Sequence, residues 1–126
     1  VINVGYLKDR KDDYVKNEIA EVIKAVRGKL VKVIIESAML TDEEIVRAVR
    51  LSCEAGADFV KTCTGFTGGV ATVEAVSLMK KSVTNGVKVK ASAGIRNYED
   101  ALKMIEAGAE RLGTSAGVEI IKSAKN

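Results

Sequence analysis

Apolar positions recur along the chain with two alternating periodicities. Short, nearly continuous apolar runs such as VKVIIE and DFVKT have the length of strands, and between them apolar residues return every three or four positions, as on one face of a helix. Strand runs that are apolar throughout are typical of a parallel sheet covered on both faces. The alternation predicts an α/β domain of five parallel βα units joined by right-handed crossovers. The five expected strands span residues 1–4, 30–35, 58–62, 87–91 and 111–115.

The expected helices carry signals for where they begin and which face they bury. Thr41 and Glu44 have the spacing of a capping box, and Asn97 is placed to cap a later helix. A third helix is expected to begin near Thr72. The stripes expected to face the sheet are Val15, Ile19, Val22 and Val26 in the first helix, and Tyr98, Leu102 and Ile105 in the fourth.

An internal repeat supports the βα organisation. The motif Glu-Ala-Gly-Ala occurs at residues 54–57 and 106–109, an offset of 52 residues, which corresponds to two βα units of about 26 residues each. A (β/α)₈ barrel needs about 200–250 residues for its eight units, so a chain of 126 residues would be part of such a barrel. A five-stranded doubly wound, flavodoxin-like sheet is the alternative that the pattern leaves open. In both cases residues 1–126 are expected to form one domain.

The composition excludes several classes of partner and catalytic site but says little about the fold. The net charge is only +3 and basic and acidic residues are mixed along the chain, which argues against a nucleic-acid partner. No apolar run approaches the ~20 residues of a membrane span, and no signal-peptide pattern opens the chain. There is no histidine, which excludes a His-based triad, and Cys53 and Cys63 are the only cysteines, too few for a zinc site. We expect a cytoplasmic domain with reduced thiols, no metal and no cofactor.

Two lysines near the ends of neighbouring strands are the strongest candidates for catalysis. Lys61 lies near the C-terminal end of an apolar strand, the end at which parallel sheets bind ligands. Lys90 lies at the matching depth of the next strand, and paired strands are about 4.8 Å apart. Desolvation and a second ammonium group both favour a neutral amine at Lys61, which can attack a carbonyl carbon. The alternative is a structural lysine whose amine reaches the rim or pairs with a carboxylate.

Loops of glycine and other small residues follow the last three expected strands, at residues 65–69, 93–95 and 113–117. Backbone N–H groups in such loops can approach a phosphate, and the dipole of the following helix favours its charge. Tight turns alone would also explain these glycines. Together with the paired lysines, the loops favour a small phosphorylated aldehyde or sugar as substrate. Glu36, which ends the second expected strand, is a site-lining candidate without an assigned role.

Several of these segments resemble one enzyme family. FVKTCTGF, VKASAGIR and GAERLGTSAG resemble the last three strands of deoxyribose-phosphate aldolases, and VINVG and VKVIIESAMLTDEE resemble the two strands before them. The resemblance implies a class I aldolase with a complete (β/α)₈ barrel, of which this chain would supply strands four to eight. It also implies reversible cleavage of 2-deoxyribose 5-phosphate to acetaldehyde and glyceraldehyde 3-phosphate, without a metal.

The resemblance implies a role for individual residues as well. Lys61 would carry the imine, and Lys90 would favour its neutral amine and assist proton transfer. The residues that fall on phosphate-contact positions of the family are Gly65, Gly94, Ile95, Gly113 and Ser115.

The chain departs from the family pattern in ways that bear on activity. The catalytic aspartate of the family would lie two residues before Val1, and Ala93 and Ala116 stand where the family usually has glycine and often has serine. We therefore expect weak turnover from this chain alone and a need for the N-terminal half of the barrel. The alternative is a weakly active or inactive scaffold that self-associates, because the inner side of an open barrel is expected to be an apolar patch. Another phosphate-binding barrel enzyme, such as an isomerase, is less compatible with the paired lysines and the lack of histidine.

Overall fold

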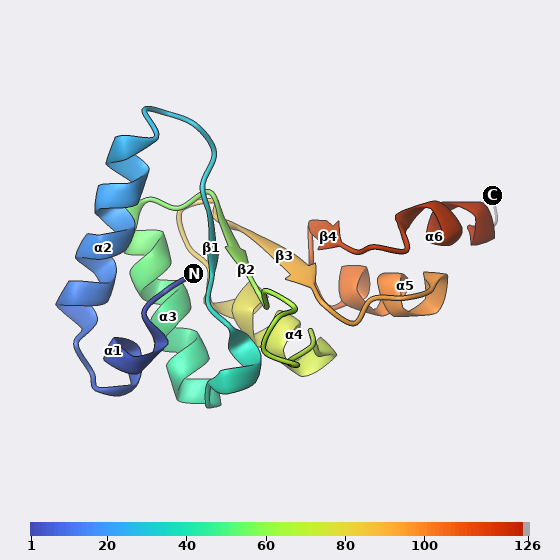
Figure 1. The fold of residues 1–126 in the computed structure, drawn as a ribbon, viewed down its shortest axis with the longest axis horizontal. Coiled ribbons are helices and arrows are strands. Elements are labelled where there is room, and N and C mark those ends of the chain that lie inside the picture. Colours follow the sequence, from blue (N-terminus) through green and yellow to red (C-terminus); the bar gives the residue numbers. More distant parts are fainter. Residues whose placement is uncertain (125–126) are drawn as a thin grey trace.

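Helices and strands alternate along the computed structural model, which describes residues 1–124 (Figure 1). After two opening helices, each strand is followed by a helix, as the apolar pattern predicts. The elements in chain order are α1 (Val4–Lys8), α2 (Asp12–Ala25), β1 (Lys32–Ile34), a 3₁₀ turn (Ser37–Met39), α3 (Asp42–Ala55), β2 (Phe59–Lys61), α4 (Val73–Ser82), β3 (Lys88–Ser92), α5 (Tyr98–Glu106), β4 (Arg111–Gly113) and α6 (Gly117–Ser123).

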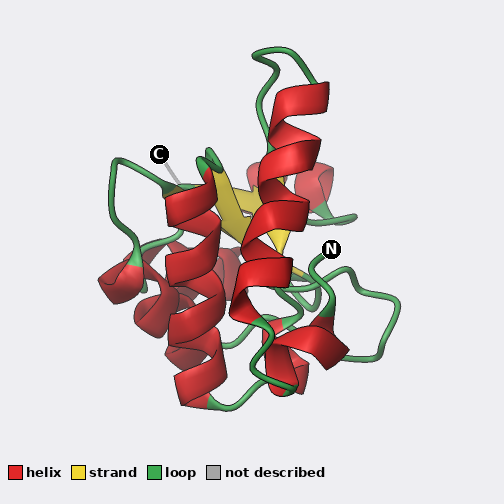
Figure 2. Cartoon of the chain, turned by 90° about the vertical axis from the view of Figure 1, so that its left-hand side faces the viewer, coloured by secondary structure: helices red, strands yellow, loops and turns green. Residues whose placement is uncertain are grey.

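The four strands form one parallel sheet whose spatial order equals the sequence order, β1-β2-β3-β4. A flavodoxin-like sheet reverses its strand order at a switch point, so the doubly wound alternative is excluded. Right-handed crossovers in sequential order place the connecting helices on one face of the sheet. From α2 to α6 each helix contacts the next (Figure 2). This is the arrangement of consecutive units in a (β/α)₈ barrel.

The strand expected at residues 1–4 is absent from this sheet, so the structure has four strands where the sequence predicted five. Helix α1 begins at Val4 because the side chain of Asn3 accepts a hydrogen bond from the N–H of Tyr6 at 3.0 Å, as an N-cap does. Ile2 nevertheless donates its N–H to the carbonyl of Ile34 at 3.0 Å. The opening residues therefore run along the free edge of β1 through a single strand-like hydrogen bond.

The core lies between the sheet and its helices. Val33, Val60, Val89 and Ala91 point from the strands toward the helices and are at most 6% exposed. The stripe predicted on α2 is buried at its start, at Val15 and Ile19, whereas Val22 is half exposed. The observed burial thus agrees well with the alternation along the strands and only in part with the stripe predicted on α2.

The stripe predicted on α5 is right at Tyr98, which packs against the core, but wrong by one position at Leu102 and Ile105. Ala101 and Met104 are buried, whereas Leu102 and Ile105 are 37% and 52% exposed. Both pairs have the three-residue spacing of a helical face. The apolar pattern does not distinguish two adjacent stripes when both are apolar, and the larger residues proved to be on the outside.

The face of the sheet away from the helices, here called the inner face, is basic rather than apolar. Alternation along the strands places five cations on it: Lys32, Lys61, Lys88, Lys90 and Arg111. Phe59 on the same face is only 6% exposed, because the Arg111 guanidinium carbon lies 4.9 Å and Lys32 Nζ 5.9 Å from its ring centre. The expected exposed apolar patch is therefore wrong, since lysine and arginine occupy five positions of this face beside Ile34 and Phe59.

Candidate active site

A cavity of about 470 Å³ lies at the C-terminal ends of β2, β3 and β4. It is formed by the last inward residue of β2 and by the three small-residue loops that follow these strands. Lys61, Gly65, Gly94, Ile95, Gly113 and Ser115 all line it. The structure therefore brings six of the seven predicted site residues together, and their roles stay predictions.

Lys90, the seventh, lies beside the cavity. The strand register pairs it with Lys61 on one side and Arg111 on the other. A β-carbon added at Gly113 would lie 2.9 Å from Lys90 Cε and 3.5 Å from its Nζ. The missing side chain at Gly113 thus leaves the space that the Lys90 amine occupies.

The electrostatics of the inner face act most clearly on Lys90. Burial lowers the pKa of Lys90, and the neighbouring charges of Lys61, Lys32 and Arg111 lower this pKa further. Within residues 1–124, none of the five inner-face cations has a carboxylate oxygen within 4.0 Å. The site is therefore strongly cationic and suits an anionic substrate.

The loops around the cavity offer backbone donors. The N–H groups of Gly65, Gly94, Ile95 and Ser115 have no acceptor among the described residues. Gly94 has φ +80°, and a β-carbon there would come within 2.8 Å of Val70, so a side chain would be excluded on both grounds. These donors are the kind that bind a phosphate.

Four residues that line the cavity lie outside the three loops that the sequence reasoning selected: Thr64, Val70, Ser92 and Arg96. Arg96 follows Gly94 and Ile95 directly and adds an exposed cation at the mouth. Its position next to two predicted contact residues was a signal that could have identified it. Thr64 and Ser92 are hydroxyl residues beside the loops, which sequence alone does not separate from turn formers.

Hydrogen bonds among the strand ends hold β2 and β3 together just beyond the lysine pair. The hydroxyl of Thr62 donates to the carbonyl of Ser92 at 2.9 Å and accepts from its N–H at 3.0 Å. The hydroxyl of Ser92 in turn donates to the carbonyl of Cys63 at 2.6 Å. Cys63 is itself buried, with its Sγ 3.6 Å from Ser37 Oγ. Rigid strand ends fix the spacing of Lys61 and Lys90.

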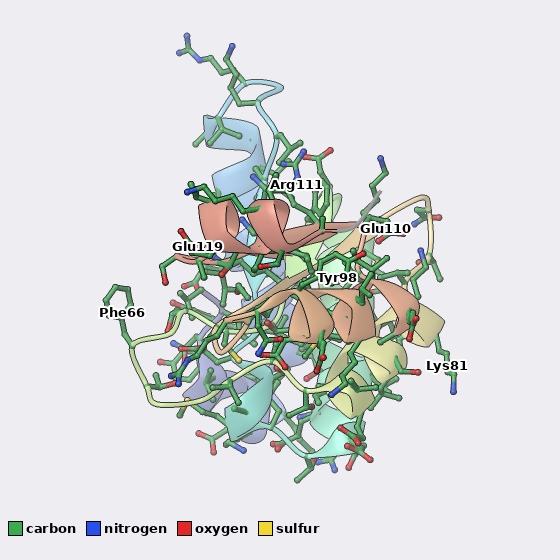
Figure 3. All side chains as sticks on the ribbon, turned by 90° about the vertical axis from the view of Figure 1, so that its right-hand side faces the viewer. Phe66, Lys81, Tyr98, Glu110, Arg111 and Glu119 are labelled. Carbon is green, nitrogen blue, oxygen red and sulfur yellow. The ribbon has the colours of Figure 1, made fainter. Side chains whose placement is uncertain are left out.

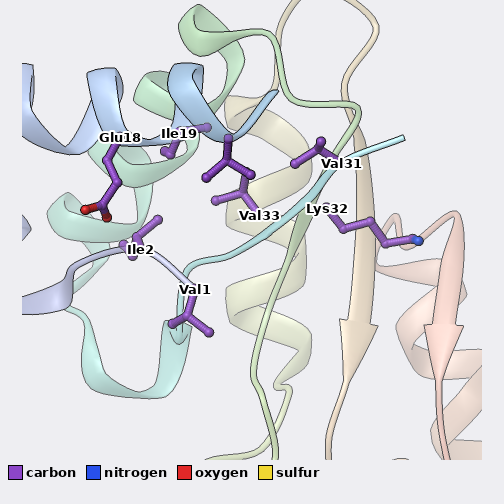
Figure 4. Close-up of a pocket in the computed structure, with 8 residues that line it drawn as sticks. Val1, Ile2, Glu18, Ile19, Val31, Lys32 and Val33 are labelled. Atoms are coloured by element: carbon purple, nitrogen blue, oxygen red, sulfur yellow. The ribbon is translucent and has the colours of Figure 1, made fainter. Parts of the chain in front are cut away.

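A second, smaller cavity of about 90 Å³ lies beside the edge of β1, between the opening residues and α2 (Figure 4). Its walls include Ile2, Ile19 and Val33, whereas the Lys32 side chain extends to the opposite side of the strand. Over the part of the chain that the structure describes, there is no cluster of three or more potential metal ligands, and no helix is long and apolar enough to cross a bilayer. A third cavity of about 610 Å³ is lined by residues of α5 and Ser123. The cavity at the strand ends is the candidate site because it contains Lys61 and residues of all three small-residue loops.

Comparisons with known proteins identify the family of the chain. The family model of the DeoC/LacD family aldolases matches residues 1–123. A deoxyribose-phosphate aldolase of Thermococcus kodakarensis is 61% identical over 126 residues, which cover 98% of this chain and 56% of that protein. The chain therefore spans little more than half the length of this relative.

Solved structures give the same result for the fold. A protein described as QR15, an aldolase, is 47% identical with a TM-score of 0.91, and the match covers 97% of this chain and 55% of that one. A deoxyribose phosphate aldolase of Aeropyrum pernix, described as a unique tetramer, is 35% identical with a TM-score of 0.82 over 89% of this chain and 49% of that one. The fold is thus part of a (β/α)₈ barrel, and the chain belongs to the DeoC/LacD family of aldolases.

Proposed function

We propose that this chain carries the lysine-bearing half of a class I aldolase that reversibly cleaves 2-deoxy-D-ribose 5-phosphate to acetaldehyde and glyceraldehyde 3-phosphate. The observation that carries the proposal is the pair Lys61 and Lys90, side by side across β2 and β3 at the mouth of a donor-rich cavity. Relatives named for this activity are about 60% identical to the chain. No cofactor is needed for this chemistry, because the protonated imine that the amine forms with the substrate accepts the electron pair.

In the proposed mechanism the neutral amine of Lys61 attacks the carbonyl carbon of the open-chain sugar and, with loss of water, forms an imine. As a base removes the proton of the C3 hydroxyl group, the protonated imine accepts the electron pair of the carbon–carbon bond that breaks, which releases glyceraldehyde 3-phosphate and leaves an enamine. Protonation of the enamine and hydrolysis then release acetaldehyde and restore Lys61. Lys90, whose pKa is lowered, is placed to exchange protons with these intermediates.

Phosphate binding falls to the loops at the mouth of the cavity. Gly65, Gly94, Ile95 and Ser115 supply backbone N–H groups without other acceptors in residues 1–124. Gly113 contributes by the space it leaves for Lys90, and Arg96 adds positive charge at the rim. The phosphate would thus lie across the three loops, with the carbonyl carbon directed toward Lys61.

The partner that suits the inner face is the N-terminal half of the barrel, in the same longer protein or in a second chain. The four strands would then be strands five to eight, and the opening residues the end of strand four. The five inner-face cations favour a partner face that is not itself cationic, and a second copy of the same face would be repelled. This repulsion argues against a scaffold in which two copies pair through their inner faces. A homo-oligomer would therefore form through other faces.

We infer a cytoplasmic enzyme that binds neither membrane nor nucleic acid.

Borohydride trapping tests the assignment directly. The chain is incubated with acetaldehyde and borohydride, and peptide mapping should locate an ethyl group on Lys61, which Lys61→Met should abolish. An adduct on Lys90 or Lys88 would contradict the assignment. Turnover by this chain alone should be weak, since general acid–base help is worth roughly 10²–10⁴-fold, and should rise when the N-terminal half of the Thermococcus kodakarensis relative is added.

A further inference from the structure

Glu36 is a buried carboxylate at the C-terminal end of β1 that does not line the cavity. It is 4% exposed, and its backbone is left-handed, with φ 53° and ψ 57°, although it is not glycine. A buried acid is unfavourable unless its oxygens receive hydrogen bonds, and a left-handed backbone is unfavourable for a residue with a side chain. Both features indicate that contacts of Glu36 hold it in place.

Both hydrogen bonds of the Glu36 carboxylate come from one residue of the loop after β2. One carboxylate oxygen accepts the backbone N–H of Thr64 at 2.8 Å, and the other accepts its hydroxyl at 2.7 Å. Thr64 Oγ1 in turn accepts the N–H of Phe66 at 3.2 Å. A continuous chain of hydrogen bonds therefore runs from the end of β1 into this loop. Phe66 marks the loop's exposed tip, where its ring projects from the molecule (Figure 3).

Gly65 lies between the two residues that this chain of bonds fixes. It lines the cavity with φ +88°, and its N–H has no acceptor among the described residues. An ionised carboxylate can accept both Thr64 donors at once through charge-assisted bonds. Holding the loop in one conformation reduces the entropy that is lost when a ligand binds.

We propose that Glu36 is a positioning residue: by holding Thr64 it presents the Gly65 N–H to the phosphate of the substrate. The inference rests on the proposed function, which places a phosphate in this cavity. A nearby negative charge also repels an anion, and this effect acts in the opposite direction. If the positioning effect is larger, removing the Glu36 charge weakens phosphate binding, and if the repulsion is larger, removing it strengthens phosphate binding.

The test measures phosphate binding at single amides. Inorganic phosphate is titrated into the ¹⁵N-labelled chain and the Gly65 amide resonance is followed. We expect this resonance to shift in the unmodified chain, and the phosphate affinity to fall on the order of tenfold in Glu36→Gln and Thr64→Val, as expected for a disordered binding loop. Thr64→Ser keeps the hydroxyl and should restore most of the affinity. Glu21→Gln, which neutralises an exposed carboxylate on α2, should change nothing.

The outcomes separate a positioning role from general loss of structure. Loss of phosphate affinity in Glu36→Gln should exceed any loss of acetaldehyde trapping on Lys61, because acetaldehyde has no phosphate. Should Glu36→Gln fail to fold, the Thr64→Val and Thr64→Ser pair decides in its place. Unchanged or tighter phosphate binding in these variants, or a Gly65 amide that ignores phosphate, would overturn the proposal. Failed trapping with an intact Gly65 response would instead refute the aldolase chemistry and leave the positioning role standing.

Discussion

Individual residues of the candidate site were predictable where the information is local to one strand. Lys61 and Lys90 were placed at matching depths from their positions in neighbouring apolar runs, and the register pairs them. The contact between Glu36 and Thr64 was not predictable, because it depends on how a side chain after β1 and a loop after β2 are oriented, which the apolar pattern does not specify. The approach of Arg111 to the lysine pair depends on the register of a fourth strand, which the apolar pattern does not specify.

The lowered pKa of Lys90 predicts a pH dependence of stability. The folded-state pKa of Lys90 lies below its ordinary value of 10.5, so between these two values the unfolded chain binds more protons than the folded one. The contribution of Lys90 to the free energy of unfolding therefore increases as the pH rises from its folded-state pKa toward 10.5. Lys90→Met removes a desolvated, repelled charge and should be more stable than the unmodified chain at pH 7, with the gain shrinking toward pH 10.

Urea unfolding at several pH values measures this effect. The control is Lys29→Met, which removes an exposed lysine from the loop before β1 and should show little difference at any pH. A Lys90→Met variant that is less stable at pH 7, with an unchanged difference at pH 10, would show that packing of the Lys90 stem outweighs its electrostatics.

At the scale of the elements, helix starts were predicted well and helix faces less well. Thr41, Thr72 and Asn97 each accept a hydrogen bond from the N–H three residues later, which confirms the three predicted starts. These caps depend on residues within one turn. The buried face of α5 depends instead on what packs against it, so Ala101 and Met104 were missed. Asn3 was read as part of a strand although it caps α1, a helix of only five residues.

The capping box of α3 should contribute measurably to stability. Thr41 Oγ1 accepts the Glu44 N–H at 3.3 Å, and the Glu44 carboxylate accepts the Thr41 N–H at 2.9 Å. This bond and Lys8 lower the pKa of Glu44 to about 2, so its contribution is present at neutral pH and lost as the pH falls toward that value. Thr41→Ala should cost about 1 kcal/mol in the free energy of unfolding, whereas Thr84→Ala in the loop before β3 should cost little. Equal losses for the two variants would contradict the capping role.

The strand-end hydroxyl of Thr62 makes a second element-scale prediction. Thr62 is fully buried and forms two hydrogen bonds with the backbone of Ser92. Thr62→Val keeps the volume but leaves both Ser92 groups without these partners, which should cost roughly 1–3 kcal/mol. Ser52→Ala is the matched comparison, because its equally buried hydroxyl only donates to the Ala48 carbonyl of its own helix. Chemical denaturation should show the larger loss for Thr62→Val, and the reverse order would contradict a lock between β2 and β3.

At the scale of the whole molecule, the repeated βα pattern left a partial barrel and a doubly wound sheet open. The family resemblance predicted the barrel correctly, but the apolar runs predicted the character of its open side wrongly. The chain has a net charge of +3, and five of its cations share the inner face. The remainder of the molecule is therefore slightly acidic. The exposed apolar side chains lie elsewhere, including Ile105 on α5 and Val118 and Ile121 on α6, at 52–74% exposure. The positive charges therefore oppose pairing of two copies through their inner faces, while faces with exposed apolar side chains remain available for association.

This charge distribution predicts how self-association responds to salt. Repulsion between two inner faces extends over about 30 Å at 0.01 M salt and only about 8 Å at 0.15 M. Association through that face should therefore strengthen as salt is added. A triple variant, Lys32→Gln with Lys88→Gln and Arg111→Gln, should associate more strongly at low salt than the unmodified chain and respond less to added salt. Sedimentation velocity at micromolar concentration measures both quantities.

The matched control removes three cations from another place. Lys24→Gln with Arg27→Gln and Lys29→Gln lowers the net charge equally, but acts on exposed residues around the end of α2. If only net charge mattered, the two triple variants would behave alike. Stronger association confined to the inner-face variant locates the repulsion on that face, because Lys32 and Arg111 no longer hold a second copy away from Phe59. Dissociation of the unmodified chain by salt would contradict this, and would indicate that opposite charges on other faces hold its copies together.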